Sequence, residues 1–385
     1  MNILFVTHYP GFGGANQSAL HLMRLLRDRH GVNPIATTPF NGSFVDKMAE
    51  EGIPCHTIRY ASWRGPRTGI KGLLFAVATL LVNLVALPKG LLLVKSAKID
   101  IIHINSSLAF YGWLLGKIAR RPVVWHLREF GDKDYPMSFY FGTGLSGKII
   151  GASDAVIAIS EAIRNYYSKF VRADSRMKVI YNVVDVNVSI AQMSRSQSGI
   201  DILEGFKLCT IGSISDSKNQ IEVVRALGAL KSTGRLGNIH YYVIGGGNGD
   251  TKQKFDNLVA SVGLEDVVHV LGEQDNIWPM ASRMDAFVVP SKNEGFGRVV
   301  VEGMLCSKPV IVANAGALPE LIDDGVDGLI YELGNEQALA DRIDELHSNE
   351  DMRRRLGTAA RKKAEECFDA SINADKVFNL YEDLL

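Results

Sequence analysis

Short apolar runs that end in glycine or polar residues recur along the chain and alternate with segments of helical periodicity. The first run, Ile3–Thr7, is followed by a glycine loop and then by Leu20, Met23 and Leu26 at helical spacing. Strands that alternate with helices in this way form parallel sheets, and the helices cover both faces of those sheets. We therefore expect an α/β protein with doubly wound sheets.

The alternation occurs twice, on either side of a Ser-rich segment at 191–205. The expected strands of the first series are Ile3–Thr7, Asn33–Thr37, Ile99–Ile104, Val123–Trp125 and Ala155–Ile159. Those of the second series are Phe206–Ile211, His240–Ile244, Val267–Leu271, Ala286–Val289 and Pro309–Ala313. Because 385 residues exceed one ordinary core, we expect more than one domain. The prediction is an N-terminal domain at 1–190, a linker at 191–205, a C-terminal domain at 206–365 and a final helix at 366–385 that packs back on the N-terminal domain.

Composition excludes several classes of protein. Basic and acidic residues balance at 42 each, so there is no net basic field for nucleic acid. The cysteines, Cys55, Cys209, Cys306 and Cys367, form no C-x-x-C pair. A disulfide framework or a zinc site is therefore not expected, and a reducing cytoplasm fits the chain. The first residues have neither a basic segment nor a small-residue cleavage site, so no secretory signal is expected.

Glycine clusters follow the expected strands, where ligands bind in open parallel sheets. Gly11-Phe12-Gly13-Gly14 lies between the first strand and the first helix. Its backbone could approach an anion closely, or it could be only a tight turn. The loop does not complete the dinucleotide pattern, and the second strand ends without a carboxylate, which disfavours NAD or FAD. The sequence also contains no P-loop motif.

The stretch from Pro290 to Met304 fits a nucleotide better. A loop with Gly295 and Gly297 leads into an expected helix at Arg298–Cys306, whose N-terminus favours a phosphate. Glu302, in the second turn, could accept hydrogen bonds from a ribose diol, and Glu294 could accept from sugar hydroxyls. The plainer alternatives are a capping carboxylate at Glu294 and an exposed or paired Glu302.

Glu294 and Glu302, with seven residues between them around Gly295-Phe296-Gly297, resemble a family signature. It is that of retaining, nucleotide-sugar-dependent glycosyltransferases of the GT-B fold, in the large bacterial polysaccharide and glycolipid glycosyltransferase family (group 1, family 4 type). The resemblance covers nearly the whole chain. It implies two Rossmann-like domains facing across a cleft, the N-terminal one binding mainly the acceptor and the C-terminal one mainly the nucleotide sugar.

Other segments match the family's pattern by position. Gly13-Gly14 matches its N-terminal glycine loop, His126 its active-site histidine, and Tyr181–Asp185 the end of its N-terminal domain. Lys218 matches its phosphate-binding lysine, and Ala315-Gly316 the stretch after the signature. The resemblance implies His126, Lys218 and Glu294 as catalytic residues. It implies a donor-binding set of Gly13, Gly14, Ser213, Lys218, Gly245, Glu294, Gly295, Phe296, Gly297, Arg298 and Glu302.

One position departs from the family's pattern. The family often carries an arginine where this chain has Ser213, so one cation for the diphosphate is missing. Lys218 and helix N-termini would then have to suffice, or Arg298 would compensate. Base recognition is expected through backbone atoms near Glu273–Ile277.

The resemblance also implies the mechanism. It implies no cofactor and no metal, with same-face attack by the acceptor and retention of configuration. Asp132-Lys133-Asp134, the one D-x-D string, is interpreted as chance in a polar loop. His126 would contact the sugar or position the acceptor, or it could be a satisfied histidine beneath the site.

The most hydrophobic run is Leu73–Leu87, which stops at Pro88. Its fifteen residues are short for a bilayer-spanning helix, which needs about 20. The alternatives are a buried crossover helix and a helix that lies in the membrane interface. Trp63, Arg64, Arg67, Lys71, Lys89 and Lys95 flank the run and suit anionic headgroups.

The expected function is transfer of a sugar from a nucleoside diphosphate sugar, such as a UDP-sugar, to a glycan or lipid-linked glycan acceptor in polysaccharide or glycoconjugate synthesis. The alternative is a non-catalytic GT-B protein that supports another glycosyltransferase. A third option is a different reaction, such as that of a nucleotide-sugar epimerase or a glycan phosphorylase. The size and motifs of the chain do not fit a phosphorylase. We expect a cytoplasmic protein, with 63–95 as a candidate peripheral contact with the plasma membrane.

Overall fold

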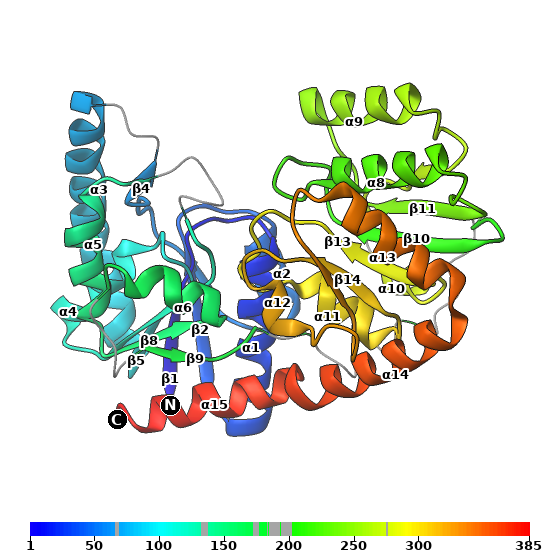
Figure 1. Ribbon diagram of the computed structural model, residues 1–385. Coiled ribbons are helices and arrows are strands. Elements are labelled where there is room, and N and C mark those ends of the chain that lie inside the picture. The colour runs from blue at the N-terminus through cyan, green and yellow to red at the C-terminus, as the bar shows by residue number, and fades with distance from the viewer. Residues whose placement is uncertain are drawn as a thin grey trace. The chain divides into compact units, whose positions relative to one another are not determined.

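The computed structural model describes residues 1–65, 69–131, 138–171, 177–182, 184, 193, 202–274 and 276–385 (Figure 1). The chain forms two compact units, Met1–Asn182 with Ala370–Leu385, and Val183–Asp369. The N-terminal segment of the first unit extends to Asn182, and the boundary predicted from the sequence is at 190. Most of the expected linker at 191–205, and the Asp132-Lys133-Asp134 string, lie outside the described residues.

A seven-stranded parallel sheet forms the centre of the first unit, in the order β3-β2-β1-β5-β6-β8-β9. Its strands are β1 (Asn2–Val6), β2 (Asn33–Thr38), β3 (Cys55–Thr57), β5 (Ile101–Ile104), β6 (Val123–Leu127), β8 (Ala155–Ala158) and β9 (Met177–Val179). A separate antiparallel pair joins β4 (Arg64–Gly65) to β7 (Ser138–Phe139). The unit's helices are α1 (Gly14–His30), α2 (Ser43–Glu50), α3 (Gly69–Ser96), α4 (Phe110–Ala119), α5 (Gly142–Gly151), α6 (Glu161–Ser168) and α15 (Ala370–Glu382).

A six-stranded parallel sheet forms the second unit, in the order β12-β11-β10-β13-β14-β15. Its strands are β10 (Phe206–Ile211), β11 (Ile239–Ile244), β12 (Val268–Val270), β13 (Ala286–Val289), β14 (Val310–Ala313) and β15 (Leu329–Tyr331). Its helices are α8 (Gln220–Ser232), α9 (Gly249–Ser261), α10 (Trp278–Ala281), α11 (Arg298–Leu305), α12 (Leu318–Leu321), α13 (Glu336–Ser348) and α14 (Glu350–Cys367). Strands β13 and β14 are buried on both faces, which explains their uninterrupted apolar sequences.

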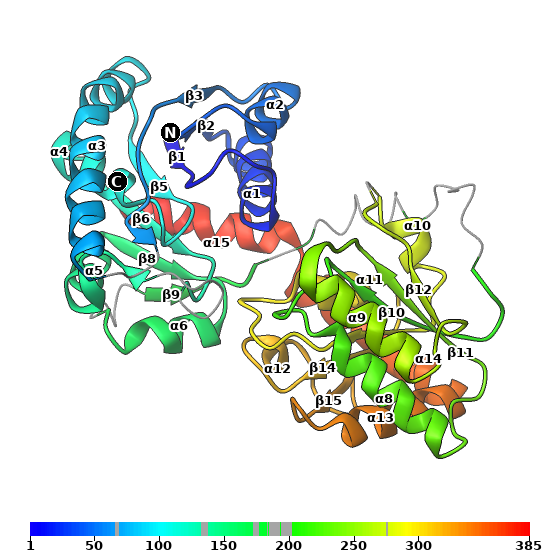
Figure 2. The same ribbon diagram turned by 90° about the horizontal axis from the view of Figure 1, so that it is seen from above.

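The final helix α15 packs in the first unit, beside α1 (Figure 2). Val377, Leu380 and Tyr381 are buried in the same core cluster as Met23 and Leu26 of α1. Full burial of such aliphatic side chains contributes about 1.5–3 kcal/mol each. The last residues of the chain are thus part of the N-terminal core.

Helix α3 does not stop at Pro88, as the sequence suggested, but continues to Ser96. Pro88 is exposed and can donate no hydrogen bond to the carbonyl of Leu84, one turn earlier. The helix continues because its other face is held by the unit. Asn83 and the backbone of Ala61 exchange hydrogen bonds of 2.8 and 3.1 Å. The expectation that this helix is too short to span a bilayer is therefore wrong by length, since Gly72–Ser96 is 25 residues long.

Candidate active site

The two loops that carry most of the expected donor residues meet at one point of the second sheet. Strands β10 and β13 are neighbours, although β11 and β12 lie between them in sequence. The strand order reverses here, and such switch points form ligand crevices in α/β sheets. Two hydrogen bonds join the loops: Lys292 N donates to the Ser217 carbonyl at 2.9 Å, and Asn219 Nδ2 to the Pro290 carbonyl at 3.3 Å.

Lys218 and Glu294 form an ion pair across this point, with Nζ 2.8 Å from Oε2. Both side chains remain partly accessible, at 32% and 19% exposure. An ammonium group has three N–H donors, and Glu294 accepts one of them. The pair therefore orients the cation in the crevice without enclosing it.

The backbone of Glu294 is held by the loop after β14. Ala317 N donates to the Glu294 carbonyl at 2.9 Å. Gly316 lies so close that a Cβ there would come within 2.7 Å of both N and O of Glu294. Its φ of +57° is also one that other residues rarely adopt. Gly316 thus positions the backbone of Glu294. In the sequence, Gly316 was noted only because Ala315-Gly316 resembles the stretch that follows the family signature.

Helix α11 begins directly after the loop, with Gly297 as its N-cap at φ +100°. No side chain caps this end and its first turn holds no acidic residue, so the first turn itself does not offset the positive end of the helix dipole. The ring of Phe296 is 3% exposed and meets Phe368 edge-on at 5.8 Å. Phe296 therefore belongs to the core of its unit, and its backbone is the part suited to a ligand.

Glu302 is buried on the second turn of α11 and pairs with Arg298, whose Nη2 lies 3.6 Å from Oε1. Burial raises the pKa of Glu302, while the charges of Arg298 and Lys218 oppose that rise. The effect of Lys218 on Glu302 shows that the two groups share one electrostatic environment. Two cations and two carboxylates thus gather at the start of α11.

The remaining donor residues of the prediction lie on adjoining loops. Ser213 is exposed, and its carbonyl accepts from Gln220 Nε2 at 3.1 Å. Gly245 has φ +153°, and a Cβ on it would come within 2.3 Å of the Gly212 carbonyl oxygen. Glu273, expected near the base, lies beside Gly246. Asp275 of that segment is outside the described residues.

Chemically, this arrangement suits a phosphorylated sugar. Lys218, Arg298 and the N-terminus of α11 can stabilise the negative charge of a diphosphate. The carboxylates of Glu294 and Glu302 can accept hydrogen bonds from hydroxyl groups. Among the residues that the structure describes, no group of three or more His, Cys, Asp or Glu is placed to hold a metal ion.

The first sheet has its own switch point, between β1 and β5. Gly13 caps α1, and a Cβ on it would come within 2.3 Å of the Tyr9 hydroxyl. Gly14 is the exposed first residue of α1, whose first turn also lacks an acidic residue. Asn105, after β5, donates to the Ala15 carbonyl at 3.0 Å and joins the two loops.

His126 lies inside strand β6, which the sequence expected to end before it, and is 1% exposed. Burial and the charge of Arg128 hold the pKa values of His126 and His103 well below the ordinary range, so both rings are neutral. Arg128 Nη2 lies 3.3 Å from His126 Nδ1 and can only donate. His126 therefore carries its proton on Nε2.

The neighbouring contacts follow from that tautomer. His103 donates from Nε2 to His126 Nδ1 at 3.1 Å and accepts the Tyr381 hydroxyl at Nδ1, at 2.6 Å. The Nε2–H of His126 has no acceptor within the part of the chain that the structure describes. It is a buried donor suited to a ligand oxygen or a water.

Sequence reasoning missed Arg128, Glu129, Asn105 and Tyr381. Arg128 donates to Asn105 Oδ1 at 2.6 Å and to Asn182 Oδ1 at 3.4 Å. Glu129 accepts from the backbone N of Ser107 at 2.7 Å. Charged residues directly after an apolar strand were the available signal. Of the expected segment Tyr181–Asp185, Val183 and Asp185 lie outside the described residues.

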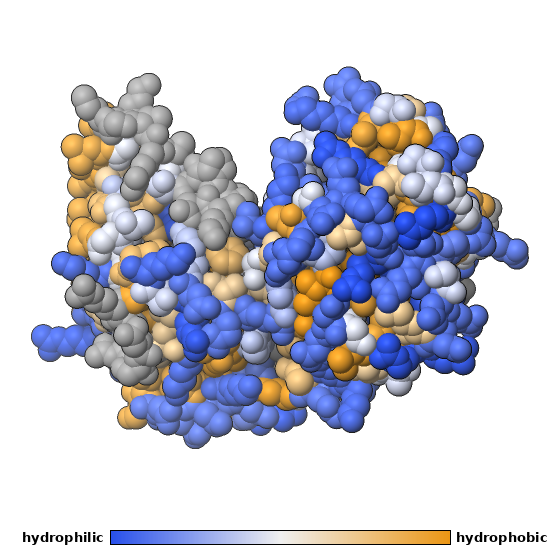
Figure 3. All heavy atoms as spheres, viewed as in Figure 1, coloured by the Kyte–Doolittle hydropathy of each residue, from blue (hydrophilic) through white to orange (hydrophobic). Residues whose placement is uncertain are grey.

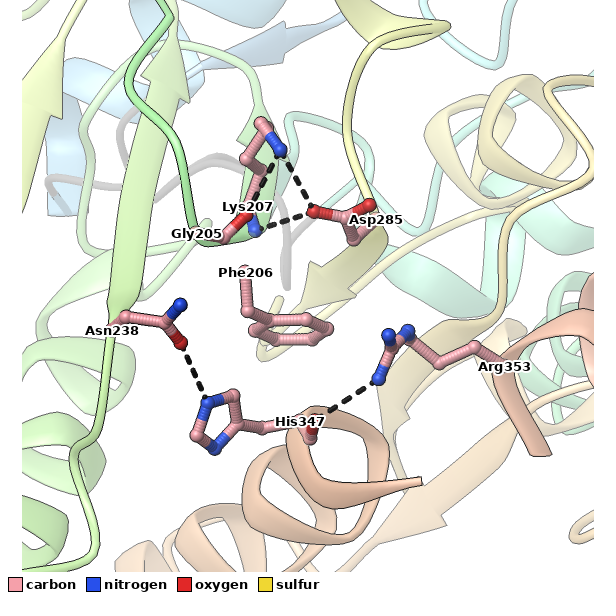
Figure 4. A pocket seen from close by; sticks show the side chains of 7 residues that line it. All are labelled: Gly205, Phe206, Lys207, Asn238, Asp285, His347 and Arg353. Carbon is pink, nitrogen blue, oxygen red and sulfur yellow. Dashed lines mark hydrogen bonds and ion pairs between the residues drawn. The ribbon is translucent and has the colours of Figure 1, made fainter. Parts of the chain in front are cut away.

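A polar pocket of about 350 Å³ opens at the opposite edge of the second sheet, before β10, β11 and β13 (Figure 4). Its charged groups interact with neighbouring protein groups. Lys207 pairs with Asp285 at 3.3 Å, His347 bonds Asn238 at 3.0 Å, and Arg353 donates to the His347 carbonyl at 3.0 Å. These contacts tie α13 and α14 to the sheet, so the pocket is interpreted as structural.

Comparison with known proteins assigns both halves of the chain. Residues 197–363 match the family model of glycosyl transferases group 1, and residues 12–188 match that of glycosyltransferase family 4. The N-acetyl-alpha-D-glucosaminyl L-malate synthase of Bacillus anthracis is 28% identical over 238 residues, 61% of each protein. The capsular polysaccharide biosynthesis glycosyltransferase CapM of Staphylococcus aureus is 26% identical over 182 residues, 47% of each. The chain thus spans about half to three fifths of these relatives' lengths.

Solved structures share the complete fold. Anabaena Alr3699/HepE in complex with UDP gives a TM-score of 0.82 at 23% identity, over 100% of both chains. Its complex with UDP-glucose gives 0.82 at 24% identity, again over 100% of both chains. The predicted GT-B fold class is therefore confirmed.

Proposed function

Because this chain belongs to the group 1 glycosyl transferases and has the GT-B fold, we propose that it transfers a sugar from a nucleoside diphosphate sugar to a glycan or lipid-linked glycan. The observation that carries the proposal is the cluster of Lys218, Glu294, Arg298 and Glu302 at the β10/β13 switch point. UDP is the proposed nucleotide, supported by the UDP and UDP-glucose complexes of the structural neighbour.

Lys218 stabilises the leaving group. Breaking the bond between the anomeric carbon and the diphosphate oxygen leaves negative charge on that oxygen. Lys218 and the N-terminus of α11 are fixed before the reaction, and such preorganised donors stabilise developing charge effectively. Arg298, at the first position of α11, takes the role of the cation missing at Ser213.

The two carboxylates bind hydroxyl groups of the donor. Glu302, buried beside Arg298, accepts from the ribose diol. Glu294 accepts hydrogen bonds from hydroxyl groups of the transferred sugar. Its ion pair with Lys218 holds the sugar in a fixed position relative to the diphosphate. Neither carboxylate acts as a covalent nucleophile in this proposal.

The acceptor hydroxyl attacks on the same face from which the diphosphate leaves. A carbon–oxygen bond forms to the acceptor, the bond to the phosphate oxygen breaks, and the acceptor proton passes to the departing phosphate. This pathway gives retention. NMR of the product's anomeric proton tests it, and an inverted product would rule it out.

The acceptor binds the first unit, where the Gly13-Gly14 loop lies at a switch point and His126 offers its buried Nε2–H to a sugar hydroxyl. The relative CapM, named for capsular polysaccharide biosynthesis, supports a glycan acceptor. A cytoplasmic location is proposed because all four cysteines are free.

The reaction is proposed to need no metal and no cofactor. Lys218 and Arg298 would supply the positive charge that a divalent ion supplies in other sugar transferases. Transfer should therefore persist in excess chelator, and activity restored only by added Mg²⁺ or Mn²⁺ would contradict this.

The experiment for the whole proposal combines binding with turnover. A thermal-shift screen over nucleoside diphosphates and their sugars identifies the donor, because a ligand of the native state raises stability by mass action. Release of the nucleoside diphosphate with an acceptor extract then measures transfer. Binding without release under any acceptor would favour the non-catalytic alternative.

A further inference from the structure

Helix α3 presents an apolar face away from its own unit. Leu74, Leu81, Val85 and Leu92 are 64%, 56%, 80% and 68% exposed. Their spacings of seven, four and seven residues place them on one stripe of the helix. At 1.5 Å per residue this stripe is roughly 27 Å long. In Figure 3 hydrophobic side chains gather at this edge of the first unit, on the left.

The opposite face of α3 packs against the rest of the first unit. Besides Asn83, Thr79 Oγ1 donates to the Ser62 carbonyl at 3.3 Å, and Tyr111 of α4 donates to the Ala86 carbonyl at 3.2 Å. Gly90 packs so closely that a Cβ would meet the Tyr111 hydroxyl at 2.1 Å. A helix that crossed a bilayer would have to give up these contacts, so α3 is suited to lie along a surface and not to span it.

Charge indicates what that surface is. The chain as a whole is neutral, yet residues 69–121 contain seven basic residues and a single acidic one, Asp100. The basic residues are Lys71, Lys89, Lys95, Lys98, Lys117, Arg120 and Arg121. Helix α3 itself contains no carboxylate, and Lys89 and Lys95 are exposed on it. An apolar stripe beside basic residues is the pattern of interfacial helices on anionic lipid.

We propose that α3 binds the surface of a bilayer containing anionic lipids, with its axis in the membrane plane and the stripe Leu74, Leu81, Val85 and Leu92 inserted at the headgroup–acyl boundary. The acceptor-binding unit would then act at the membrane, where a lipid-linked glycan is found. Binding to lipid needs no sugar transfer, so the membrane-binding proposal can be tested independently of the enzymatic activity.

Flotation with vesicles tests the proposal without nucleotide or acceptor. The full chain should float with phosphatidylglycerol–phosphatidylcholine vesicles, and less with phosphatidylcholine alone. It should also float less with the anionic vesicles at 0.5 M salt, because the Debye length falls from about 10 Å at 0.1 M toward about 3 Å at 1 M. The double variant Leu81→Gln, Val85→Gln should reduce the bound fraction at least tenfold. Lys89→Gln with Lys95→Gln should reduce binding severalfold, on anionic vesicles only.

Val326→Gln is the matched control, because Val326 of the other unit is an apolar side chain that is as exposed as Leu81, at 56%. It should float like the unchanged chain, and all variants should keep their melting temperature. No flotation of the unchanged chain would overturn the proposal, as would equal loss with Val326→Gln. Concentration-dependent dimers that vanish in Leu81→Gln, Val85→Gln, without vesicle binding, would also overturn it, by identifying a second copy as the occupant.

Discussion

Lys218 and Glu294 lie 76 residues apart in sequence, yet their charged atoms are 2.8 Å apart. The sheet order makes this contact, because β10 and β13 are adjacent and the loop after each strand opens at the same edge. The pair is partly exposed, so its contribution to stability is small, about 0–1 kcal/mol. We propose that the role of this pair is to orient a cation toward a ligand.

Lys218→Ala should lower the rate of sugar transfer about 100- to 1000-fold, the usual effect of losing one preorganised donor to developing charge. The melting temperature should change little. Lys292→Ala is the control, because Lys292 is an exposed lysine on the loop that carries Glu294. Steady-state kinetics would check both, and near-normal turnover of Lys218→Ala would remove the residue from the mechanism.

Gly316→Ala should impair donor binding by moving Glu294, since the new Cβ would lie within 2.7 Å of the Glu294 backbone. Gly325→Ala separates this effect from backbone strain. Gly325 has φ +75° but open space around its Cβ direction. Both variants should lose about 1–2 kcal/mol of stability from left-handed backbone. Only Gly316→Ala should also lower the affinity for the nucleotide sugar, as measured by calorimetry. Equal affinities of the Gly316→Ala and Gly325→Ala variants would contradict the positioning role of Gly316.

Glu302→Gln should weaken donor affinity at least tenfold, because hydrogen bonds to a charged group are worth about 1.5–3 kcal/mol. Burial raises the pKa of Glu302, so the unchanged protein should lose affinity as the pH falls through that raised pKa from neutrality. Titrations with a nucleotide sugar, whose diphosphate does not gain protons in this range, would measure it. The Gln variant should show a flat profile, and the same slope in both proteins would assign the titration elsewhere.

Stability should fall as the pH drops below about 6.5, the ordinary histidine value. His103 and His126 have strongly lowered pKa values, so they remain neutral when folded while the unfolded chain takes up protons. Each contributes up to about 1.4 kcal/mol per pH unit. Urea unfolding between pH 7 and 5 would test this. A shallower slope is expected for His103→Gln, and an unchanged slope would show that other groups cause the loss.

Most strands could be predicted from sequence because the signals are local. Ala286–Val289 is a continuous apolar run, and Phe206–Ile211 is a mainly apolar run that Lys207 and Thr210 interrupt. Turn residues follow both, and the structure has the same bounds. The continuation of α3 past Pro88 could not be predicted, because contacts such as those of Asn83 outweigh the local cost of proline.

In the candidate site, neighbouring residues could be predicted where their spacing along one helix brings them together, as for Arg298 and Glu302. Contacts between distant segments could not be predicted. The hydrogen bond from Tyr381 to His103 joins residues 278 positions apart, and nothing in either segment indicates the partner. The burial of Phe296 likewise depends on Phe368, which follows α14.

The central claim is that the loops after β10 and β13 bind a nucleoside diphosphate sugar. Calorimetric titration of UDP into the unchanged chain, Lys218→Ala, Glu302→Gln and Lys292→Ala tests it most directly. We predict saturable one-to-one binding that both Lys218→Ala and Glu302→Gln weaken at least tenfold and Lys292→Ala leaves intact. Equal UDP affinity in all four proteins would place the nucleotide elsewhere and contradict the account.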